Sequence, residues 1–359
     1  MMNTSKIKFL ALSFALVVGA TAEAKVFTVE SGSKPAALTA SQWDLLLTSL
    51  EDEVNSKFTD NATVSSVIAN FESGKYNKGS ANATAMASSG TTAVYGSSFK
   101  YGLVGFSGSV GADLGEGNSI TNFDAKKVAG ASIQSAAVIG FSPGSITSSQ
   151  WGFIDPSRLR LFVSFLTYDQ KLDDADVSFT TFGAVGHYRI IAEKSIGMGV
   201  AKWNGVDVSS GIRYAKNKLS FTTVIADIPD QTQGPITASI ADSPATIGAD
   251  VGVFSVPVEV STSVRLLYFL NLFGGVGGDF NFGSSKSVAV YDAPITFSGG
   301  SGSATGSLDL GANASPTPWN LRGFAGAGIE FAIGTLNLSV GKSFTAGTLN
   351  ANVGFNLFF

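Results

Sequence analysis

The chain has 359 residues, and only 14% of them are charged, against about 25% in a typical soluble domain. It contains no cysteine, which excludes a disulfide framework and a thiolate metal site. The formal net charge of −4 argues against a nucleic-acid-binding surface. Glycine (42 residues) and phenylalanine (27 residues) are abundant, and the mean hydropathy is positive, at +0.25.

The N-terminus has the pattern of a secretory signal peptide. Lys6 and Lys8 precede the apolar stretch Phe9–Gly19, and Ala22-Glu23-Ala24 supplies a small-x-small cleavage site. The apolar stretch is too short to span a bilayer. We predict that residues 1–24 are removed, which leaves 21 basic and 26 acidic residues and a formal charge of −5.

Residues 25–85 differ from the rest of the chain because their apolar residues follow a helical spacing. Thr39 and Gln42 form a capping box, which predicts that a helix begins there. The apolar residues at helical spacing after it are Trp43, Leu46, Leu47, Leu50, Val54 and Phe58. Residues 64–71 suggest a second, shorter helix, and Lys75–Gly90 has the Ser-, Ala- and Gly-rich composition of a linker.

From residue 86 onward, apolar and polar residues alternate with the period of β-strands. The even positions from Phe254 to Leu270 are apolar or Thr, whereas the odd positions include Ser255, Glu259 and Arg265. No apolar run of about 18 residues follows the signal peptide. Because only helices and closed barrels satisfy the backbone in lipid, we predict that residues 86–359 form an all-β, antiparallel up-and-down barrel in the outer membrane of a diderm bacterium.

The C-terminal strand alternates up to a terminal aromatic residue, Phe359. Here the chain resembles bacterial outer-membrane β-barrels as a class. The resemblance implies that Phe355, Leu357 and Phe359 form the assembly signal that the barrel-assembly machinery reads, with outer-membrane lipid as the other partner. The alternative is an ordinary edge strand.

The strand count is expected to be about fourteen. The predicted strands are 99–114, 127–141, 158–168, 177–192, 203–214, 218–227, 254–270, 272–282, 287–297, 303–312, 320–333, 336–344 and 349–359. Since bacterial barrels have even counts, a further strand near Met86–Ser97 gives fourteen, and twelve is the alternative. This count makes Lys216–Lys218 a tight turn, and it places the 229–250 loop outside and residues 298–302 in the periplasm.

All six arginines fall in predicted strands, at positions with the parity of the inward face. With four inward carboxylates they form a predicted ion-pair network of the lumen: Arg158, Arg160, Arg189, Arg213, Arg265, Arg322, Asp207, Glu259, Asp279 and Glu330. Guanidinium suits a confined site because it binds carboxylate through two parallel hydrogen bonds. The pairs either brace the lumen or line an anion-attracting constriction.

The sequence contains no convincing active site. Any Ser-His-acid triad would have to use the single histidine, His187, whose surroundings lack the motifs of membrane-embedded lipases and proteases of the barrel class. We therefore expect His187 to line the lumen. The acidic residues at 173–176 resemble a solvated turn more than a calcium site. We predict no enzymatic activity, cofactor or metal.

Two stretches, Lys202–Phe221 and Val256–Gly283, resemble leptospiral surface-adhesin proteins. The resemblance implies a surface-exposed protein that contacts host extracellular-matrix components such as laminin. Fourteen strands behind a helical segment are also similar to the fatty-acid transporter class, although that family's Asn-Pro-Ala signature is absent here.

Three functions therefore remain open from the sequence: a surface barrel whose loops bind external ligands, a narrow pore for small solutes, and a plugged transporter of hydrophobic molecules. A barrel needed only for envelope structure is a fourth. Residues 25–85 plug the lumen, cover one mouth or pack elsewhere.

Overall fold

A computed structural model describes residues 27–60, 74–91, 94–95, 99–115, 128–147, 149–172, 174–196, 200–225, 227–291, 294–311 and 313–359. The predicted signal peptide and the predicted second helix at 64–71 lie outside these residues. No helix in the described part of the chain has the length and apolarity to cross a membrane.

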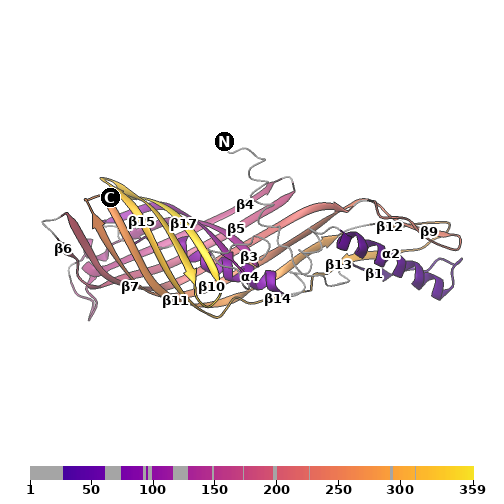
Figure 1. Cartoon of the computed structure of the whole chain (residues 1–359), viewed down its shortest axis with the longest axis horizontal. Coiled ribbons are helices and arrows are strands. Elements are labelled where there is room, and N and C mark those ends of the chain that lie inside the picture. The colour runs from indigo at the N-terminus through magenta and orange to yellow at the C-terminus, as the bar shows by residue number, and fades with distance from the viewer. Residues whose placement is uncertain are drawn as a thin grey trace.

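Ten strands form a closed antiparallel ring at one end of an elongated molecule (Figure 1). In ring order they are β2 (Gly102–Asp113), β3 (Gly130–Phe141), β4 (Leu159–Leu172), β5 (Ala175–Ile191), β7 (Ala201–Ile225), β10 (Ser243–Leu266), β11 (Leu270–Tyr291), β15 (Trp319–Phe331), β16 (Gly334–Ser343) and β17 (Thr348–Phe358). The pairing of β17 with β2 and that of β7 with β10 complete the ring. Two short strands, β6 (Lys194–Ile196) and β14 (Asn313–Ala314), extend the sheet along β7 and β11.

The ring is staggered, as barrel closure requires. Paired residues followed once around from Phe282 on β11 return to the same strand at Leu270, twelve residues away. A stagger of this kind accompanies strands tilted by about 35–45° from the barrel axis. We call the end that holds the C-terminus and the turns 267–269 and 332–333 the proximal end, and the opposite end the distal end.

The predicted counts of fourteen and twelve are therefore wrong. The predicted strands 203–214 and 218–227 are one strand, β7, and the predicted turn Lys216–Lys218 lies inside it. Likewise β11 takes up 272–282 and the first part of 287–297. The physical reason is that the outward face of each strand changes from apolar to charged part-way along, which resembles the end of a membrane strand.

The predicted linker at Lys75–Gly90 and the predicted extra strand at Met86–Ser97 are also wrong. Residues Lys75–Thr91 form the helix α4, which lies inside the ring against β2, β3 and β17. Its small residues allow this close approach: a Cβ on Gly79 would meet the Ala129 carbonyl at 2.4 Å, and one on Gly111 would meet that of Ala83 at 2.3 Å. The barrel wall thus begins at β2 and not at residue 86.

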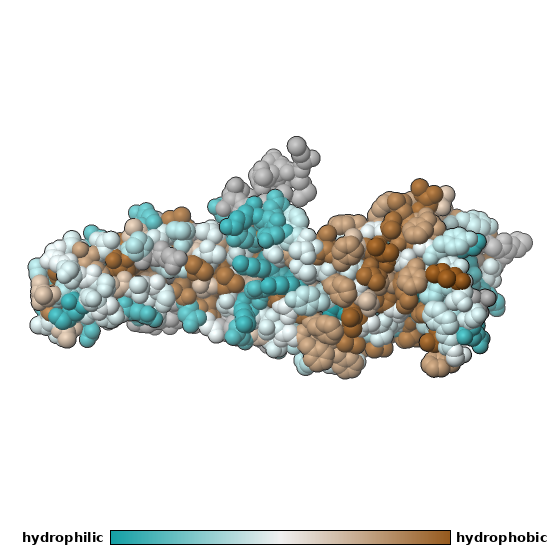
Figure 2. All heavy atoms as spheres, turned by 180° about the vertical axis from the view of Figure 1, so that it is seen from behind, coloured by the Kyte–Doolittle hydropathy of each residue, from teal (hydrophilic) through white to brown (hydrophobic). Residues whose placement is uncertain are grey.

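The outer surface of the ring is an apolar band, seen in brown in Figure 2. Its outward aliphatic residues are more than a third exposed and include Val104, Val110, Ile139, Val163, Val260, Val276, Leu338 and Val353. The inward residues are polar and buried and include Ser107, Gln134, Ser164, Thr181, Ser209, Ser261, Asn281 and Asn350. This inside-out pattern is typical of a transmembrane barrel.

The distal end carries a second unit, which we call the distal cap. It consists of β1 (Phe27–Ser31), α2 (Ala40–Asp60), β8 (Gln231–Gln233), β9 (Ile236–Ile240), β12 (Ile295–Ser298) and β13 (Ala304–Leu308). β1 pairs with β13, and β9 pairs with both β8 and β12. The predicted capping box of α2 is confirmed: Thr39 N donates to Gln42 Oε1 over 2.9 Å, and Gln42 N donates to Thr39 Oγ1 over 3.3 Å.

The cap corrects the predicted topology of two loops. Residues 229–250 and 298–302 were expected on opposite sides of the membrane, but β9 and β12 pair with each other, with Phe297 opposite Ala238. Both connections therefore lie at the distal end. The error follows from the extra strands, since each additional strand reverses the side of the next loop.

Candidate functional site

Four charged side chains and one tyrosine form a buried cluster in the lumen. Arg213 Nη2 donates to Glu259 Oε1 over 2.7 Å, and Arg322 Nε donates to Asp279 Oδ2 over 2.7 Å. Arg322 also bonds to Glu259, and Arg213 Nη1 lies 3.6 Å from Asp279 Oδ1. Tyr95 Oη donates to the second Glu259 oxygen, Oε2, over 2.6 Å. Each charge therefore has partners of opposite sign from two other strands, which braces the interior.

The other predicted network residues do not join this cluster. Arg189 Nε pairs with Asp207 Oδ1 at 3.2 Å. Arg265 Nη1 pairs with Glu330 Oε1 at 3.0 Å. Arg265 thus pairs with Glu330, and not with Glu259 or Asp279 of the buried cluster. The reason is the position of Arg265 along its strand: it lies near the proximal end of β10, six residues from Glu259.

Two arginines have different surroundings from these pairs. Arg160 has its guanidinium over the Phe99 ring, 5.6 Å from the centroid. Arg158 contradicts the prediction of an inward strand position, because it ends the short 3-10 helix Pro156–Arg158 and pairs with Asp155 at 3.4 Å on the proximal surface. Hydrogen bonds from Ser157 lower the pKa of Asp155. Proline at 156 starts a turn of helix here, which removes Arg158 from the alternation.

The helix α4 fills the distal part of the lumen. Near its start, Asn77 Oδ1 accepts from Ser285 Oγ over 3.1 Å, on the distal half of β11. Near its end, Asn350 Nδ2 on β17 donates to the carbonyl of Met86 over 2.9 Å and to Ser89 Oγ over 3.1 Å. Polar contacts thus hold α4 along its length, and most of its residues are buried.

Aromatic side chains close the proximal part of the lumen below α4. The Tyr95 ring stacks on Phe324 with centroids 4.5 Å apart, and on Phe273 at 5.3 Å. Further down, Phe99 packs edge-on against Phe162 at 5.9 Å. A cavity of about 20 Å³ where α4 ends has room for about one water molecule. The helix α4 and these aromatic rings therefore occupy both the distal and the proximal part of the lumen.

His187 lines the lumen and lies among aromatic rings. Its ring centroid is 4.9 Å from Phe162 and 6.0 Å from Tyr95, and the side chain is buried. No group of three potential metal ligands occurs among the residues that the structure describes. The acidic residues near 174 lie at the tip of the β4–β5 hairpin, where Asp174 is exposed.

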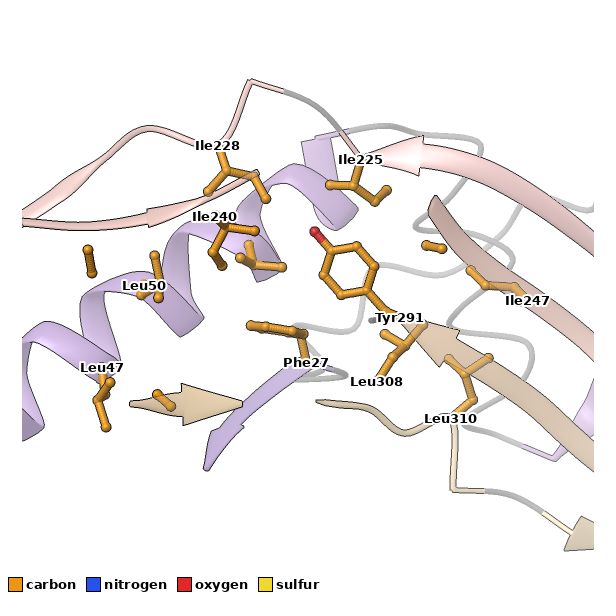
Figure 3. Close-up of a cluster of buried hydrophobic side chains, with 14 of the residues drawn as sticks. Phe27, Leu47, Leu50, Ile225, Ile228, Ile240, Ile247, Tyr291, Leu308 and Leu310 are labelled. Carbon is orange, nitrogen blue, oxygen red and sulfur yellow. The ribbon is translucent and has the colours of Figure 1, made fainter. Parts of the chain in front are cut away.

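The distal cap has an apolar core of its own. Figure 3 shows Phe27 and Leu50 of the N-terminal segment beside Ile240 of β9, Tyr291 of β11 and Leu308 of β13. The core continues onto the inward faces of the distal halves of β7, β10 and β11, through residues such as Ile225, Ile247 and Val251. Burial raises the pKa of Tyr291 to about 12, with a further contribution from the Asp242 carboxylate.

Several residues that build the closed lumen were missed from the sequence. Tyr95 lies in the segment expected to be a strand, yet it contacts Glu259. Of the asparagines of β17, Asn350 holds α4, and Asn352 bonds to Ser339 on the neighbouring strand. Their inward parity was visible in the sequence, but an amide on the inward face of a barrel is equally compatible with a water-filled lumen.

Comparison with protein families identifies the chain. Residues 21–359, nearly the whole sequence, match the model of the Lsa36-like family. The chain belongs to the Lsa36-like family. No curated protein matches the sequence. The part of this family member that forms the ring and the cap lies entirely within the matched residues.

The chain is only weakly similar to solved structures. The translocator domain of the autotransporter NalP from Neisseria meningitidis is 12% identical, with a TM-score of 0.33 over 77% of this family member and 93% of that chain. The transport unit of the autotransporter AIDA-I from Escherichia coli is 9% identical, with a TM-score of 0.27 over 80% and 99%. CarO from Acinetobacter baumannii is 10% identical, with a TM-score of 0.26 over 71% and 97%. The barrel assignment rests instead on the strand pairing and on the apolar band.

Proposed function

We propose that this Lsa36-like protein is an integral outer-membrane barrel that displays the distal cap at the cell surface, where the cap binds external ligands, host extracellular-matrix proteins among them. The observation that carries the proposal is the cap itself: a unit with an apolar core and a polar exterior, raised beyond the apolar band on a barrel with a filled lumen. The resemblance of Lys202–Phe221 and Val256–Gly283 to leptospiral surface adhesins agrees with this function.

The lengths of the connections support the outward orientation of the cap. At the proximal end, residues 267–269 and 332–333 make short turns, and residues 142–158 and 192–200 make longer connections. The longest connection, residues 292–318, lies at the distal end, and together with residues 226–242 it carries β8, β9, β12 and β13. Outer-membrane barrels have short periplasmic turns and longer extracellular loops. The distal end is therefore the outer one, and the C-terminus faces the periplasm.

The filled lumen argues against the two transport functions. A pore for small solutes requires a continuous aqueous path, and α4 with Tyr95 and Phe99 occupies the space where that path would run. A transporter of hydrophobic molecules requires an apolar compartment in the lumen. The lumen contains instead a polar wall and the Arg213–Glu259–Arg322–Asp279 cluster.

The binding test uses single cysteines, because the natural chain has none. Ser49 is exposed on α2 of the cap, and Ser149 is exposed in the proximal connection between β3 and β4. A large polyethylene glycol maleimide is attached to Ser49→Cys or to Ser149→Cys, and binding of each refolded protein to immobilised laminin is measured. We expect the conjugate on the cap to weaken binding by about tenfold or more, and the proximal conjugate to leave it unchanged.

Two results would contradict the proposal. Undiminished binding by the cap conjugate means that the ligand contacts another surface. Equal loss with both conjugates means that the polymer acts through the fold and not by covering a site. Migration of the unheated protein in gel electrophoresis checks that both variants remain folded barrels.

A further inference from the structure

The order of contacts along the chain shows that the backbone passes through the ring from one end to the other. β2 runs from Gly102 at the proximal end to Asp113 at the distal end. Asn82 of α4 donates to the Asp113 carboxylate over 3.0 Å, at the distal end of β2. Nine residues later, the carbonyl of Thr91 accepts from Ser107 Oγ over 2.7 Å, halfway along the same strand.

The chain after α4 continues in the same direction to the proximal rim. Phe99 reaches Phe358, the last residue of β17, with ring centroids 6.4 Å apart. Tyr101 N then donates to the carbonyl of Phe359 over 3.3 Å, and β2 begins. Tyr101 itself is exposed at the proximal end. Residues 74–91, 94–95 and 99–101 therefore follow one another from the distal to the proximal end of the lumen, and the chain enters the wall only after it has reached the proximal rim.

Residues 27–60, the described part of the chain before α4, lie at the other end. β1 pairs with β13, with Phe27 opposite Leu308, and α2 contributes Leu46 and Leu50 to the cap core. Phe27 is also tied to α2, since its backbone N donates to Asn55 Oδ1 over 3.0 Å and its carbonyl accepts from Asn55 Nδ2 over 2.9 Å. The N-terminal segment is thus built into the cap and cannot lie at the proximal mouth in this fold.

We infer that the barrel carries its own N-terminal segment across the membrane, with residues 27–60 outside the cell, α4 remaining in the lumen and the C-terminus in the periplasm. The inference deepens the proposed function and takes the outward direction from it. A chain exported into the periplasm has all of its parts on one side at first. The threaded structure therefore requires that residues 27–60 move outward through the ring, or that the ring closes around residues 74–101 while the cap assembles outside.

The small side chains of α4 fit this passage. The helix sequence KYNKGSANATAMASSGT has one aromatic residue and no branched aliphatic residue. The wall is equally close on its side: a Cβ added at Gly130 would meet the backbone N of Ser80 at 2.1 Å. A helix with larger side chains would not fit this ring of ten strands, so the composition is the one that a polypeptide held in the lumen needs.

Labelling of three single-cysteine variants with a membrane-impermeant maleimide tests the inference. The positions are Ser49 on α2, Asp230 in the connection between β7 and β10, and Ser149 in the connection between β3 and β4; all three side chains are exposed. We expect Ser49→Cys and Asp230→Cys to react on intact cells and Ser149→Cys to react only after lysis. The heat-dependent gel mobility of each variant verifies that the barrel has formed.

The possible outcomes separate the inference from the proposed function. Reaction at Asp230→Cys but not at Ser49→Cys on intact cells would overturn the threading, while the barrel would still display its distal loops. Reaction at Ser149→Cys alone would leave the two ends on opposite sides but reverse the barrel, and it would overturn both outward export and surface display. Reaction at all three positions on intact cells would overturn the assignment of opposite sides.

Discussion

The strands β7, β10 and β11 are each built from two halves with opposite hydrophobic patterns. On the proximal half of β10, the inward residues are Ser255, Glu259, Ser261 and Ser263, and the outward ones include Phe254, Val258 and Val260. On the distal half, the inward residues are Ala245, Ile247, Ala249, Val251 and Val253, and the outward ones include Thr246 and Asp250. The backbone ladder between β10 and β11 continues through the change without a break.

The change occurs at one row of paired residues across five neighbouring strands. Outward aromatic residues form this row, each opposite the next in register: Phe165, Phe182, Tyr214, Phe254 and Phe282. Immediately distal to the row, Lys216 Nζ lies 3.6 Å from Asp250 Oδ2. Aromatic girdles mark the interfaces of transmembrane barrels. The same strands therefore leave the membrane at this row, and lipid outside one half and water outside the other dictate the opposite patterns.

The proximal half of the ring has a polar interior, which water can enter. We therefore predict that α4 is the element that closes the distal part of the lumen. Removal of residues 75–91 from the full chain should convert a barrel without stepwise conductance in a planar bilayer into one that conducts. The deletion leaves the aromatic contacts of Tyr95 and Phe99 in place, so its conductance should be small. A conducting intact protein would show that α4 does not seal the ring, and a silent deletion variant would show that the aromatic contacts suffice.

The proximal interior should depend strongly on Glu259, whose carboxylate contacts both Arg213 and Arg322. Glu259→Ala leaves two buried guanidinium groups with Asp279 as their remaining partner, and breaking a buried pair costs about 3–5 kcal/mol. The matched control is Glu330→Ala, which removes the partner of the partly exposed Arg265 and should cost about 0–1 kcal/mol. Denaturant midpoints of barrels reconstituted in vesicles give both values. Equal losses would mean that the cluster is well hydrated.

Substitutions of two outward valines on paired strands test whether lipid or water surrounds each half of the ring. Val260 on β10 faces outward in the proximal half, and Val224 on β7 faces outward in the distal half; they are 44% and 61% exposed. Val260→Lys should destabilise the barrel by up to about 2–4 kcal/mol, because it places a charge in the hydrocarbon. Val224→Lys should change the free energy of unfolding by no more than about 0.5 kcal/mol. A similar cost at both positions would refute the boundary at the aromatic row.

The sequence correctly predicted the strands whose outward face contacts lipid along their whole length. The strands β2, β3, β15, β16 and β17 are close to their expected ranges, and Arg213 and Arg322 lie inward as their parity indicated. The prediction divided β7 and β11 because the outward residues become polar or charged at Lys216 and after Phe282. Such a change resembles a turn when the surroundings of each half, lipid or water, are not known. The helix α4 resembled a linker, because it has no large apolar residues at helical spacing and because its Gly, Ser and Asn residues have lower helix propensity than its Ala residues.

The cap could not be predicted because its contacts are long-range: Phe27 pairs with Leu308, and Ala238 pairs with Phe297. Neither short strand shows an alternation long enough to identify it, and the partners lie hundreds or tens of residues apart. The capping box of α2 is local and was therefore predicted correctly. What the sequence lacked was the information that these segments share one core.

The smallest expected effect is a decrease in the free energy of unfolding of the cap at alkaline pH. It tests whether the interior of the cap is apolar, in contrast to the polar lumen. Tyr291 lies in the cap core, 5.5 Å from the Phe27 ring, and burial raises its pKa to about 12. The unfolded chain loses this proton near the ordinary tyrosine value of about 10. Between these two pH values the unfolded state binds fewer protons than the folded one, so the free energy of unfolding of the cap falls as pH rises. Below pH 10 both states are protonated and the effect vanishes.

Tyr291→Phe cannot ionise, so between pH 10 and 12 its cap should lose less stability than the natural cap does, each relative to its own stability at neutral pH. The fluorescence of Trp43, which is buried in the cap core, reports the unfolding of the cap when Trp151, Trp203 and Trp319 are replaced by Phe. Other tyrosines and lysines titrate in the same range, and the difference between the two proteins removes their common contribution. Parallel pH profiles would mean that Tyr291 meets water in the folded cap, and the apolar interior of the distal half would then end below it.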